Sequence, residues 1–502
     1  MNTFKRKALS CAILGGLGAV AGTAHAVYED PNGLGQALIF PYYTVQSAGG
    51  NSYNTYISVV NTTSRAKALK VRFREGKNSR EVLDFNLYLS PNDVWTAAVI
   101  PGDATATSGG RLITADKSCT APTIGSGGVD FRNYAYNGAA ADGAGTGLDR
   151  TREGYLEVVE MATLTGSIAS AVTHVSGVPA NCGAVQPAVF SAATAPAGTF
   201  TPPNGGVTGS YTLINVANGA DMGGNPTVLA NFSAASIYTD VGDETTNLSS
   251  ANPPVAVVVV NQQTGVSGPG ATVYTATYAN GADAVSATLM HSNVINEYVL
   301  DAATKSATDW VMTFPTKRFY VTTTGATAPF TNKFTSTGAC EPISFQYFNR
   351  EEAGATASAG DFSPLPAVQT QSICWESQVL SIVNTAGSSA ASGVLGSANN
   401  LQVLVNSAFQ NGWANLSFTG TGATTGLSST TGTATVTNVN TGATTAATTA
   451  TFRGLPVIGF MARTLNNGTL TCTGVSGTAG SCQGSYGSLF DHKYMVSVTP
   501  AP

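Results

Sequence analysis

A period of two between apolar and polar residues is the clearest structural signal in this 502-residue chain. In the segment 68–74, apolar residues hold positions 69, 71 and 73, while the cations Lys70, Arg72 and Arg74 lie between them. The segment 82–89 repeats the alternation, with apolar residues at 83, 85, 87 and 89. Such alternation is typical of a β-strand with one buried and one solvated face. We therefore expect two strands here, with the three cations facing water.

Short apolar segments of the same kind recur along the chain, and residues that favour turns separate them. The predicted strands lie at 37–41, 56–60, 155–161, 211–216, 255–260, 272–278, 310–314, 317–321, 343–348, 379–383, 401–405 and 413–418. One helix is predicted over 283–298, with Asp283 as its N-cap and an apolar face that ends at Tyr298. The two cations within 317–321 are expected to point outward from their strand.

The sequence thus predicts a mainly β protein built from antiparallel, immunoglobulin-like sandwich domains. Long loops rich in Gly, Ala, Ser and Thr, such as 102–149 and 419–451, are expected at the surface, and helices are expected to be few and short. The predicted organisation is a signal peptide at 1–26, an N-terminal sandwich with a Gly/Ala-rich insertion at 27–165, a middle β-rich region with one helix at 209–324, and a C-terminal β-rich region with a Thr/Gly-rich loop at 340–502.

The first residues have the features of a cleavable secretory signal. A positive cluster, Lys5-Arg6-Lys7, precedes an apolar stretch at 8–20 and the small-residue site Ala24-His25-Ala26. We expect cleavage between Ala26 and Val27. The apolar stretch is shorter than the ~20 residues that cross a bilayer, and no later segment is long enough. The sequence therefore predicts an extracytoplasmic protein with no transmembrane segment in its mature chain, and it favours the cell surface or secretion over the periplasm.

Charged residues make up 10% of the chain, well below the ~25% of ordinary soluble proteins. The net charge is −5, and loss of Lys5, Arg6 and Lys7 leaves 20 cations against 28 acids, a mature charge near −8. Nucleic-acid phosphates require clustered cations, so this composition argues against a nucleic-acid partner. Self-association or other envelope components are the expected partners.

Six cysteines remain after Cys11 leaves with the signal, and an even number in an exported chain indicates disulfides. None belongs to a CxxC pair, so a zinc or redox site is not expected. Six cysteines allow 15 pairings. Pairing of sequence neighbours closes the shortest loops, which predicts the bridges Cys119–Cys182, Cys340–Cys374 and Cys472–Cys482.

Five blocks carry a family resemblance: GQALIFPYYTV (35–45), SVVNTT (58–63), VRFREG (71–76), FPTKRFYV (314–321) and FQNGW (409–413). With them the chain resembles a group of exported Gram-negative bacterial proteins, mostly uncharacterised and sometimes labelled cell-surface proteins. The resemblance implies an envelope location and a β architecture. It brings no catalytic motif that could be carried over to residues of this chain.

Catalytic motifs are missing from the sequence. It contains no Gly-x-Ser-x-Gly nucleophile elbow, no His-Glu-x-x-His and no phosphate-binding loop. The histidines His174, His291 and His492 lie far apart in sequence and are interpreted as isolated core or surface residues. Glu157 and Glu160 share a predicted strand, where a spacing of three places them on opposite faces. No catalytic or cofactor-binding residue is therefore predicted.

Two weaker ligand signals remain. Asp240, Asp243 and Glu244 are candidate calcium ligands, because calcium prefers oxygen, but the EF-hand spacing is missing and a solvated acidic turn is the favoured interpretation. Aromatic residues can stack on sugars or fill sandwich cores. The candidates for either role are Tyr42, Tyr43, Tyr53, Tyr56, Trp95, Trp310, Trp375 and Trp413.

Three hypotheses for function follow. The leading one is a non-catalytic structural or interaction protein of the cell envelope, adhesive or layer-forming, since edge strands and neutral surfaces can assemble laterally. The alternative is a periplasmic or secreted ligand-binding module for carbohydrate, which a concave aromatic patch would favour. The third is an extracellular hydrolase with a dispersed pair of carboxylates.

Overall fold

The computed structural model describes residues 25–499, apart from positions 49, 104, 106 and 440 and the segments 263–269, 357–361, 364–371, 386–390, 419–425 and 474–478. The side chains of 261–270, 361–371 and 467–483 also fall outside the description. Most of the predicted signal peptide therefore lies outside the described residues. Val27, which follows the predicted cleavage site, is buried, and its backbone nitrogen donates to the carbonyl of Val255 at 2.8 Å.

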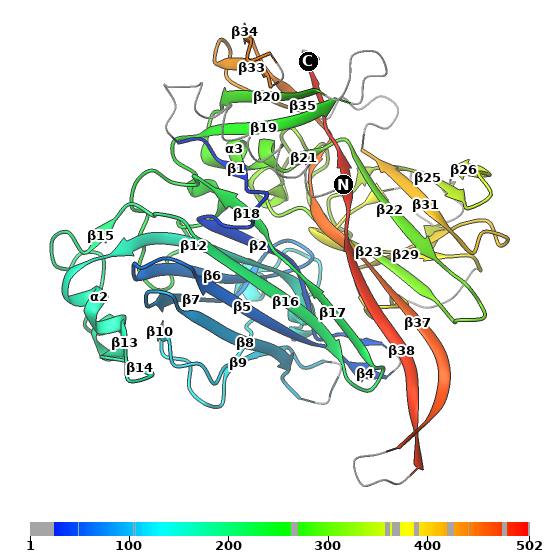
Figure 1. Cartoon of the computed structure of the whole chain (residues 1–502), viewed down its shortest axis with the longest axis horizontal. Helices are drawn as coiled ribbons and strands as arrows, with labels where there is room; N and C mark the ends of the chain where they lie inside the picture. Colours follow the sequence, from blue (N-terminus) through cyan, green and yellow to red (C-terminus); the bar gives the residue numbers. More distant parts are fainter. Residues whose placement is uncertain are drawn as a thin grey trace.

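The first sandwich consists of two antiparallel sheets (Figure 1). One has the order β1 (Tyr28–Glu29), β18 (Thr227–Ala230), β2 (Ala37–Thr44), β12 (Glu153–Leu164), β6 (Lys67–Glu75), β7 (Glu81–Leu89) and β10 (Cys119–Ala121), with β15 (Phe200–Thr201) beside β12. The other has the order β11 (Val129–Asp130), β9 (Gly110–Ile113), β8 (Val94–Pro101), β5 (Asn54–Asn61), β16 (Val207–Asn215) and β17 (Ala220–Gly224). Phe40, Val71 and Trp95 are among the residues that fill the core between them.

The second sandwich is built from the later part of the chain. One sheet has the order β26 (Gly354–Thr356), β25 (Ser344–Asn349), β31 (Asn411–Ser417), β22 (Asn293–Val299) and β39 (Lys493–Met495). The other has the order β27 (Phe362–Ser363), β30 (Asn400–Leu404), β29 (Ser377–Val383), β23 (Ala307–Thr313), β37 (Ile458–Thr473) and β38 (Ala479–Asp491). Its core includes Trp310 and Phe345. The hairpin of β37 and β38 extends past the rest of the molecule at the bottom of Figure 1.

A third β unit lies at the top of Figure 1, against the first sandwich. It contains the sheet β19 (Val255–Gln262), β20 (Gly270–Thr277), β33 (Ala434–Asn438) and β34 (Thr444–Ala447), and the sheet β32 (Gly426–Ser428), β35 (Thr451–Arg453) and β40 (Ser497–Thr499). The helix α3 (Gly281–Thr288) packs against β19. The predicted mainly β fold with antiparallel sandwiches is thus confirmed.

Short elements complete the chain. The two-stranded pairs are β3 (Ser47–Ala48) with β4 (Asn51–Ser52), β13 (His174–Val175) with β14 (Val178–Pro179), β21 (Met290–His291) with β36 (Leu455–Pro456), and β24 (Glu341–Pro342) with β28 (Ser372–Ile373). The helix α2 is Gly166–Val172, and the 3-10 helices are η1 (Tyr134–Tyr136), η2 (Gly138–Ala140), η3 (Leu148–Arg152), η4 (Cys182–Val185), η5 (Leu248–Ser250) and η6 (Lys317–Phe319). Among the described residues, no helix is both long and apolar enough to cross a membrane.

Strand pairing connects parts of the chain that are distant in sequence. The strands β16, β17 and β18, which follow residue 206, belong to the first sandwich. The strands β22 and β23 pair with β31, β29 and β37 from the last third of the chain. The expected surface insertion at 102–149 also joins the first sandwich, since β9 and β10 pair with β8 and β7, and Phe131 and Tyr136 lie in the core. The prediction for this segment was wrong in that respect.

The helix predicted over 283–298 ends at Thr288 in the structure. Its N-cap is Asn280 instead of Asp283, and the Asn280 side chain accepts the backbone N–H of Asp283 at 2.9 Å. Met290 and His291 then form β21, and the residues from Asn293 onward form β22, which pairs with β31 along its whole length. The β-branched residues there gain sheet partners that a helix would not provide, so tertiary pairing overrides the helical spacing.

The strand predicted at 317–321, with its cations outward, is also wrong. Its first three residues form the 3-10 helix η6, and Lys317 is 2% exposed. The Lys317 ammonium donates to the carbonyls of Ala339 (2.7 Å) and Cys374 (3.0 Å). Burial lowers the pKa of Lys317 to about 8. These backbone carbonyls take the place of water as hydrogen-bond acceptors, so the ammonium group can be buried inside the fold.

Candidate functional site

The cations on β6 face protein and not water, which corrects the expectation from their alternation. Lys70, Arg72 and Arg74 are 1%, 1% and 5% exposed. The loop 240–246 covers this face, and its backbone carbonyls accept hydrogen bonds from Lys70 and Arg72 at 2.7–2.9 Å. A buried cation needs such acceptors in place of water. Lys70 and Arg72 on β6 therefore fix the position of a loop that lies some 170 residues later in the chain.

Carboxylates on β7 and β12 pair with the cations of β6: Lys70 and Arg72 pair with Asp84 and Glu81 on β7, whereas Arg74 and Lys67 pair with β12. Lys67 pairs with Glu160 at 2.7 Å, and Arg74 Nε lies 3.1 Å from Glu157. Arg318 of η6 reaches the same carboxylate, with Nη2 at 3.3 Å from Oε1. Two guanidinium groups thus share Glu157, and their attraction outweighs burial to lower the pKa of that carboxyl. As predicted for a spacing of three, Glu157 and Glu160 meet different sets of partners on opposite faces of their strand.

The turn that joins β6 to β7 is organised by one buried carboxylate. Glu75 accepts three backbone N–H groups from residues 77, 78 and 80 at 2.8–3.0 Å, and Arg150 donates to it at 2.9 Å. Arg150 also donates to Asp142 at 2.8 Å. Ser79 in this turn has a φ of +48°, in the left-handed region that residues other than glycine rarely occupy. These contacts hold the turn in one conformation.

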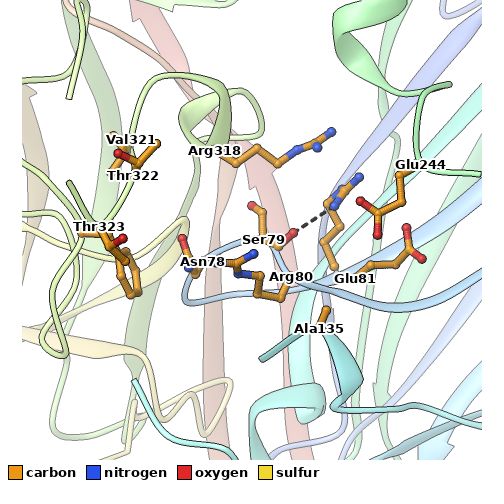
Figure 2. A pocket seen from close by; sticks show the side chains of 12 residues that line it. Asn78, Ser79, Arg80, Glu81, Ala135, Glu244, Arg318, Val321, Thr322 and Thr323 are labelled. Carbon is orange, nitrogen blue, oxygen red and sulfur yellow. Dashed lines mark hydrogen bonds between the residues drawn. The ribbon is translucent and has the colours of Figure 1, made fainter. Parts of the chain in front are cut away.

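A hollow of about 300 Å³ lies between this turn and the segment that follows η6 (Figure 2). We call it the arginine pocket. Figure 2 shows Arg318 on one side, Arg80 and Ser79 opposite, and Glu81 and Glu244 together at another side. The lining residues are Arg74, Asn78, Ser79, Arg80, Glu81, Ala135, Glu244, Arg318, Val321, Thr322, Thr323 and Phe334. Its wall therefore combines guanidinium groups, carboxylates and an apolar patch.

A buried carboxyl group adjoins the pocket through Ser79. The Ser79 hydroxyl bonds to Glu376, and Tyr155 donates to the Ser79 hydroxyl oxygen at 2.7 Å. Burial raises the pKa of Glu376 to about 7. The guanidinium groups that line the arginine pocket are donors held in place by the fold, and such donors can bind a charged group.

A second hollow, of about 600 Å³, lies between the outer face of the β22–β31 pair, the β37–β38 hairpin and the end of β17. We call it the aromatic groove. Trp413 is 42% exposed, and its ring stacks on Phe348 with centroids 4.5 Å apart and an interplanar angle of 16°. Phe490 is equally exposed, and the Arg463 guanidinium lies 4.7 Å from its ring centroid. One wall of the groove thus presents accessible aromatic surface.

Polar groups surround these rings. The amide of Asn296 lies 3.0 Å from His492 Nδ1 and links β22 to the strand end beside β38. The exposed side chains of Glu297, Asp491 and Lys493 also line the groove. With Arg463, the lining contains two cations and two carboxylates, so their formal charges balance.

The structure contains two of the three predicted disulfides. Cys119 is bonded to Cys182, and Cys340 to Cys374. The backbone places Cys472 opposite Gly480 on the β37–β38 hairpin. The side chains of the predicted Cys472–Cys482 pair lie outside the described residues, so this bridge stays a prediction.

The predicted isolated histidines are partly brought together. His291 and His492 are both buried and both contact the ring of Tyr494, with centroids 4.0 and 6.2 Å apart. Each imidazole also bonds to a backbone carbonyl at 3.1 Å. Burial lowers the pKa of His291 to about 4 and that of His492 to about 3. His174 lies elsewhere, with Nδ1 2.9 Å from the hydroxyl oxygen of Ser90.

The candidate calcium ligands occupy the loop that covers β6. Asp240 accepts the backbone N–H of Ala192 at 2.7 Å, and Asp243 accepts that of Thr245 at 2.8 Å. The loop carbonyls already bind Lys70 and Arg72. Within the described ranges, no group of three or more His, Cys, Asp or Glu side chains converges in a metal-binding arrangement.

The candidate aromatic residues divide into two sets. Tyr42, Tyr43, Tyr53, Trp95 and Trp310 are buried and fill cores. Trp375 is half-buried, whereas Tyr56 and Trp413 are exposed.

Arg318 and Arg80 were missed as site residues. Arg318 was assigned to an outward strand face, and nothing in the sequence around Arg80 signals a pocket. No family model, curated protein or solved structure matches the chain.

Proposed function

We propose that this protein is an extracytoplasmic, non-catalytic binding module for neutral saccharides and that the aromatic groove is its binding site. The observation that carries the proposal is Trp413, a half-exposed ring stacked on Phe348 within a hollow of about 600 Å³. A ring fixed from behind offers its outer surface to the apolar face of a sugar without loss of side-chain freedom. This is the concave aromatic patch that favours the carbohydrate alternative among the sequence hypotheses.

The polar rim supports a neutral ligand. Sugar hydroxyl groups both donate and accept, so they are bound by amides, carboxylates and cations together. Asn296, Glu297, Asp491, Lys493 and Arg463 supply all three kinds of group within one groove. Because their charges balance, the groove has no excess charge that a neutral ligand would leave uncompensated.

The disulfides support a location outside the cytoplasm but do not specify which compartment. The bonded pairs Cys119–Cys182 and Cys340–Cys374 are compatible with an oxidising compartment. Display at the cell surface is part of the proposal; the predicted signal supports export across the first membrane, and the family resemblance supports the surface.

A glycan array tests this function. The purified chain is expected to bind a set of neutral oligosaccharides, and Trp413→Ala is expected to lose those signals. The matched control is Tyr56→Ala, which removes an aromatic ring of similar exposure (48%) from the first sandwich. Absence of any neutral glycan signal from the wild-type protein refutes the proposal.

A second candidate function is lateral assembly, the leading sequence hypothesis. The strand β38 lies at the edge of its sheet, and its hairpin extends beyond the body of the molecule (Figure 1). Around Gly487 the strand packs against β17, so the part of the hairpin beyond this contact supplies the edge that can pair with a second chain. We expect light scattering to show association that increases with protein concentration and that Tyr486→Lys, a charge on β38, reduces. A wild-type protein that stays monomeric throughout contradicts this candidate.

A further inference from the structure

The arginine pocket has an uneven distribution of charge that the saccharide proposal does not use. Arg74 and Arg318 share the single carboxylate of Glu157. Burial, followed by repulsion from Arg74, lowers the pKa of Arg318. This part of the pocket therefore has one more cation than anion.

Two guanidinium groups there have unused donors. Arg318 Nε and Arg80 Nε are buried and have no hydrogen-bond acceptor among the described residues. Arg80 Nε lies 3.8 Å from Asp142, beyond hydrogen-bond distance. Buried donors without acceptors are unfavourable. The same two side chains line the pocket, where their guanidinium groups are available to an oxyanion.

The opposite side of the pocket carries negative charge. Arg72 Nε binds the Glu81 carboxylate at 2.5 Å, and the same guanidinium group lies 3.4 Å from the backbone carbonyl of Glu244. Glu81 is thus matched by Arg72, whereas the exposed Glu244 carboxylate lies at the rim. Figure 2 shows Glu244 and Glu81 on one side of the hollow and Arg80 displaced toward the other.

The size and the remaining wall limit the ligand further. About 300 Å³ accommodates on the order of ten non-hydrogen atoms, at the ~30 Å³ that a water molecule occupies in the liquid. Val321 and Phe334, both largely buried, add an apolar surface. The floor is rigid, because Glu75 and Arg150 hold the turn that carries Arg80.

We propose that the arginine pocket binds a small zwitterion with an apolar side chain, such as a free α-amino acid. Its carboxylate lies between Arg80 and Arg318, its ammonium group faces Glu244, and its side chain contacts Val321 and Phe334. A dianion such as phosphate is disfavoured, because the unmatched carboxylate of Glu244 would repel its second charge.

Calorimetric titration with L-leucine tests the proposal, with N-acetyl-L-leucine and L-leucinamide as probes that each lack one charge. The wild-type protein is expected to bind leucine saturably and to bind either derivative at least tenfold more weakly. Arg80→Gln and Glu244→Gln are each expected to weaken leucine binding at least tenfold. Both side chains lie at the rim, so thermal unfolding is expected to stay unchanged.

The two variants also separate the two charges. Glu244→Gln is expected to abolish the preference for leucine over its N-acetyl derivative, while Arg80→Gln abolishes the preference over the amide. Trp413→Ala is expected to leave leucine binding unchanged, so this test is independent of the saccharide proposal. No saturable leucine binding at millimolar concentration, equal binding of the derivatives, or tighter binding of inorganic phosphate overturns the assignment.

Discussion

The substitution Arg72→Met tests whether the buried cation row on β6 supports the fold. Arg72 is 1% exposed, pairs with Glu81 at 2.5 Å, and donates to the carbonyls of Asp243 (2.9 Å) and Thr246 (2.7 Å). Methionine fills similar space but has no donor, so it leaves a carboxylate and two carbonyl groups without their partner. Removal of one member of a buried ion pair costs about 3–5 kcal/mol.

The chain contains a matched control for this change. Arg111 and Asp130 form an ion pair of the same 2.5 Å length in the same sandwich, but their side chains are 37% and 43% exposed. An exposed pair contributes little to stability, because water solvates both charges once they separate. Arg111→Met is therefore expected to change stability little, although the chemical substitution is identical.

Hydrogen exchange followed by mass spectrometry is the suitable assay. A protein with several sandwiches need not unfold in one step, so a single global transition would not report on β6. Exchange of the peptides covering β6 and β7 measures the local free energy of opening. A loss of about 3–5 kcal/mol accelerates their exchange by roughly two to three and a half orders of magnitude in Arg72→Met, at about tenfold per 1.4 kcal/mol. Equal exchange in the two variants would refute the reasoning.

The further predictions concern buried ionisable groups and one disulfide. Burial lowers the pKa of His291 to about 4, so the unfolded chain takes up a proton below pH 6.5 that the folded chain does not. The free energy of unfolding is therefore expected to fall by about 3 kcal/mol between pH 6.5 and 4. In His291→Gln, the unfolding temperature should decrease less over this pH range. Burial lowers the pKa of His492 to about 3, so this residue also destabilises the fold as the pH falls, down to a lower pH than His291. Burial raises the pKa of Glu376 to about 7, so its contribution to stability declines as pH rises from 4.5 to 7, and Glu376→Gln should remove that decline from the same measurement. Reduction of Cys340–Cys374, which closes a span of 34 residues, should lower stability by about 3–4 kcal/mol in urea unfolding, whereas an unchanged midpoint would contradict the loop-entropy argument.

Sequence periodicity was sufficient for the fold class but not for the surroundings of each strand face. Alternation around Lys70 and Arg72 correctly predicts β6, because side chains of a strand point to opposite sides. It does not reveal whether the second face meets water or protein. The loop 240–246 that covers this face is remote in sequence, so no local pattern signals it.

The candidate sites were harder to predict for the same reason. The aromatic groove combines residues near 224, 296, 413, 463 and 490, which strand pairing brings together. Composition identifies Trp413 as an aromatic residue, but burial in the assembled sheets separates it from Trp95 and Trp310. Disulfide pairing was more accessible, since short loops limit the choices for Cys119 and Cys340.

Calorimetric titration with the neutral oligosaccharide of strongest array signal tests the central claim most directly. Covering the exposed 42% of Trp413 buries about 100 Å² of a side chain of ~250 Å², worth up to about 2.5 kcal/mol at ~25 cal/mol/Å². The account predicts that Trp413→Ala weakens binding at least tenfold, while Tyr56→Ala binds like the wild-type protein. Equal affinity of Trp413→Ala and the wild-type protein would contradict it.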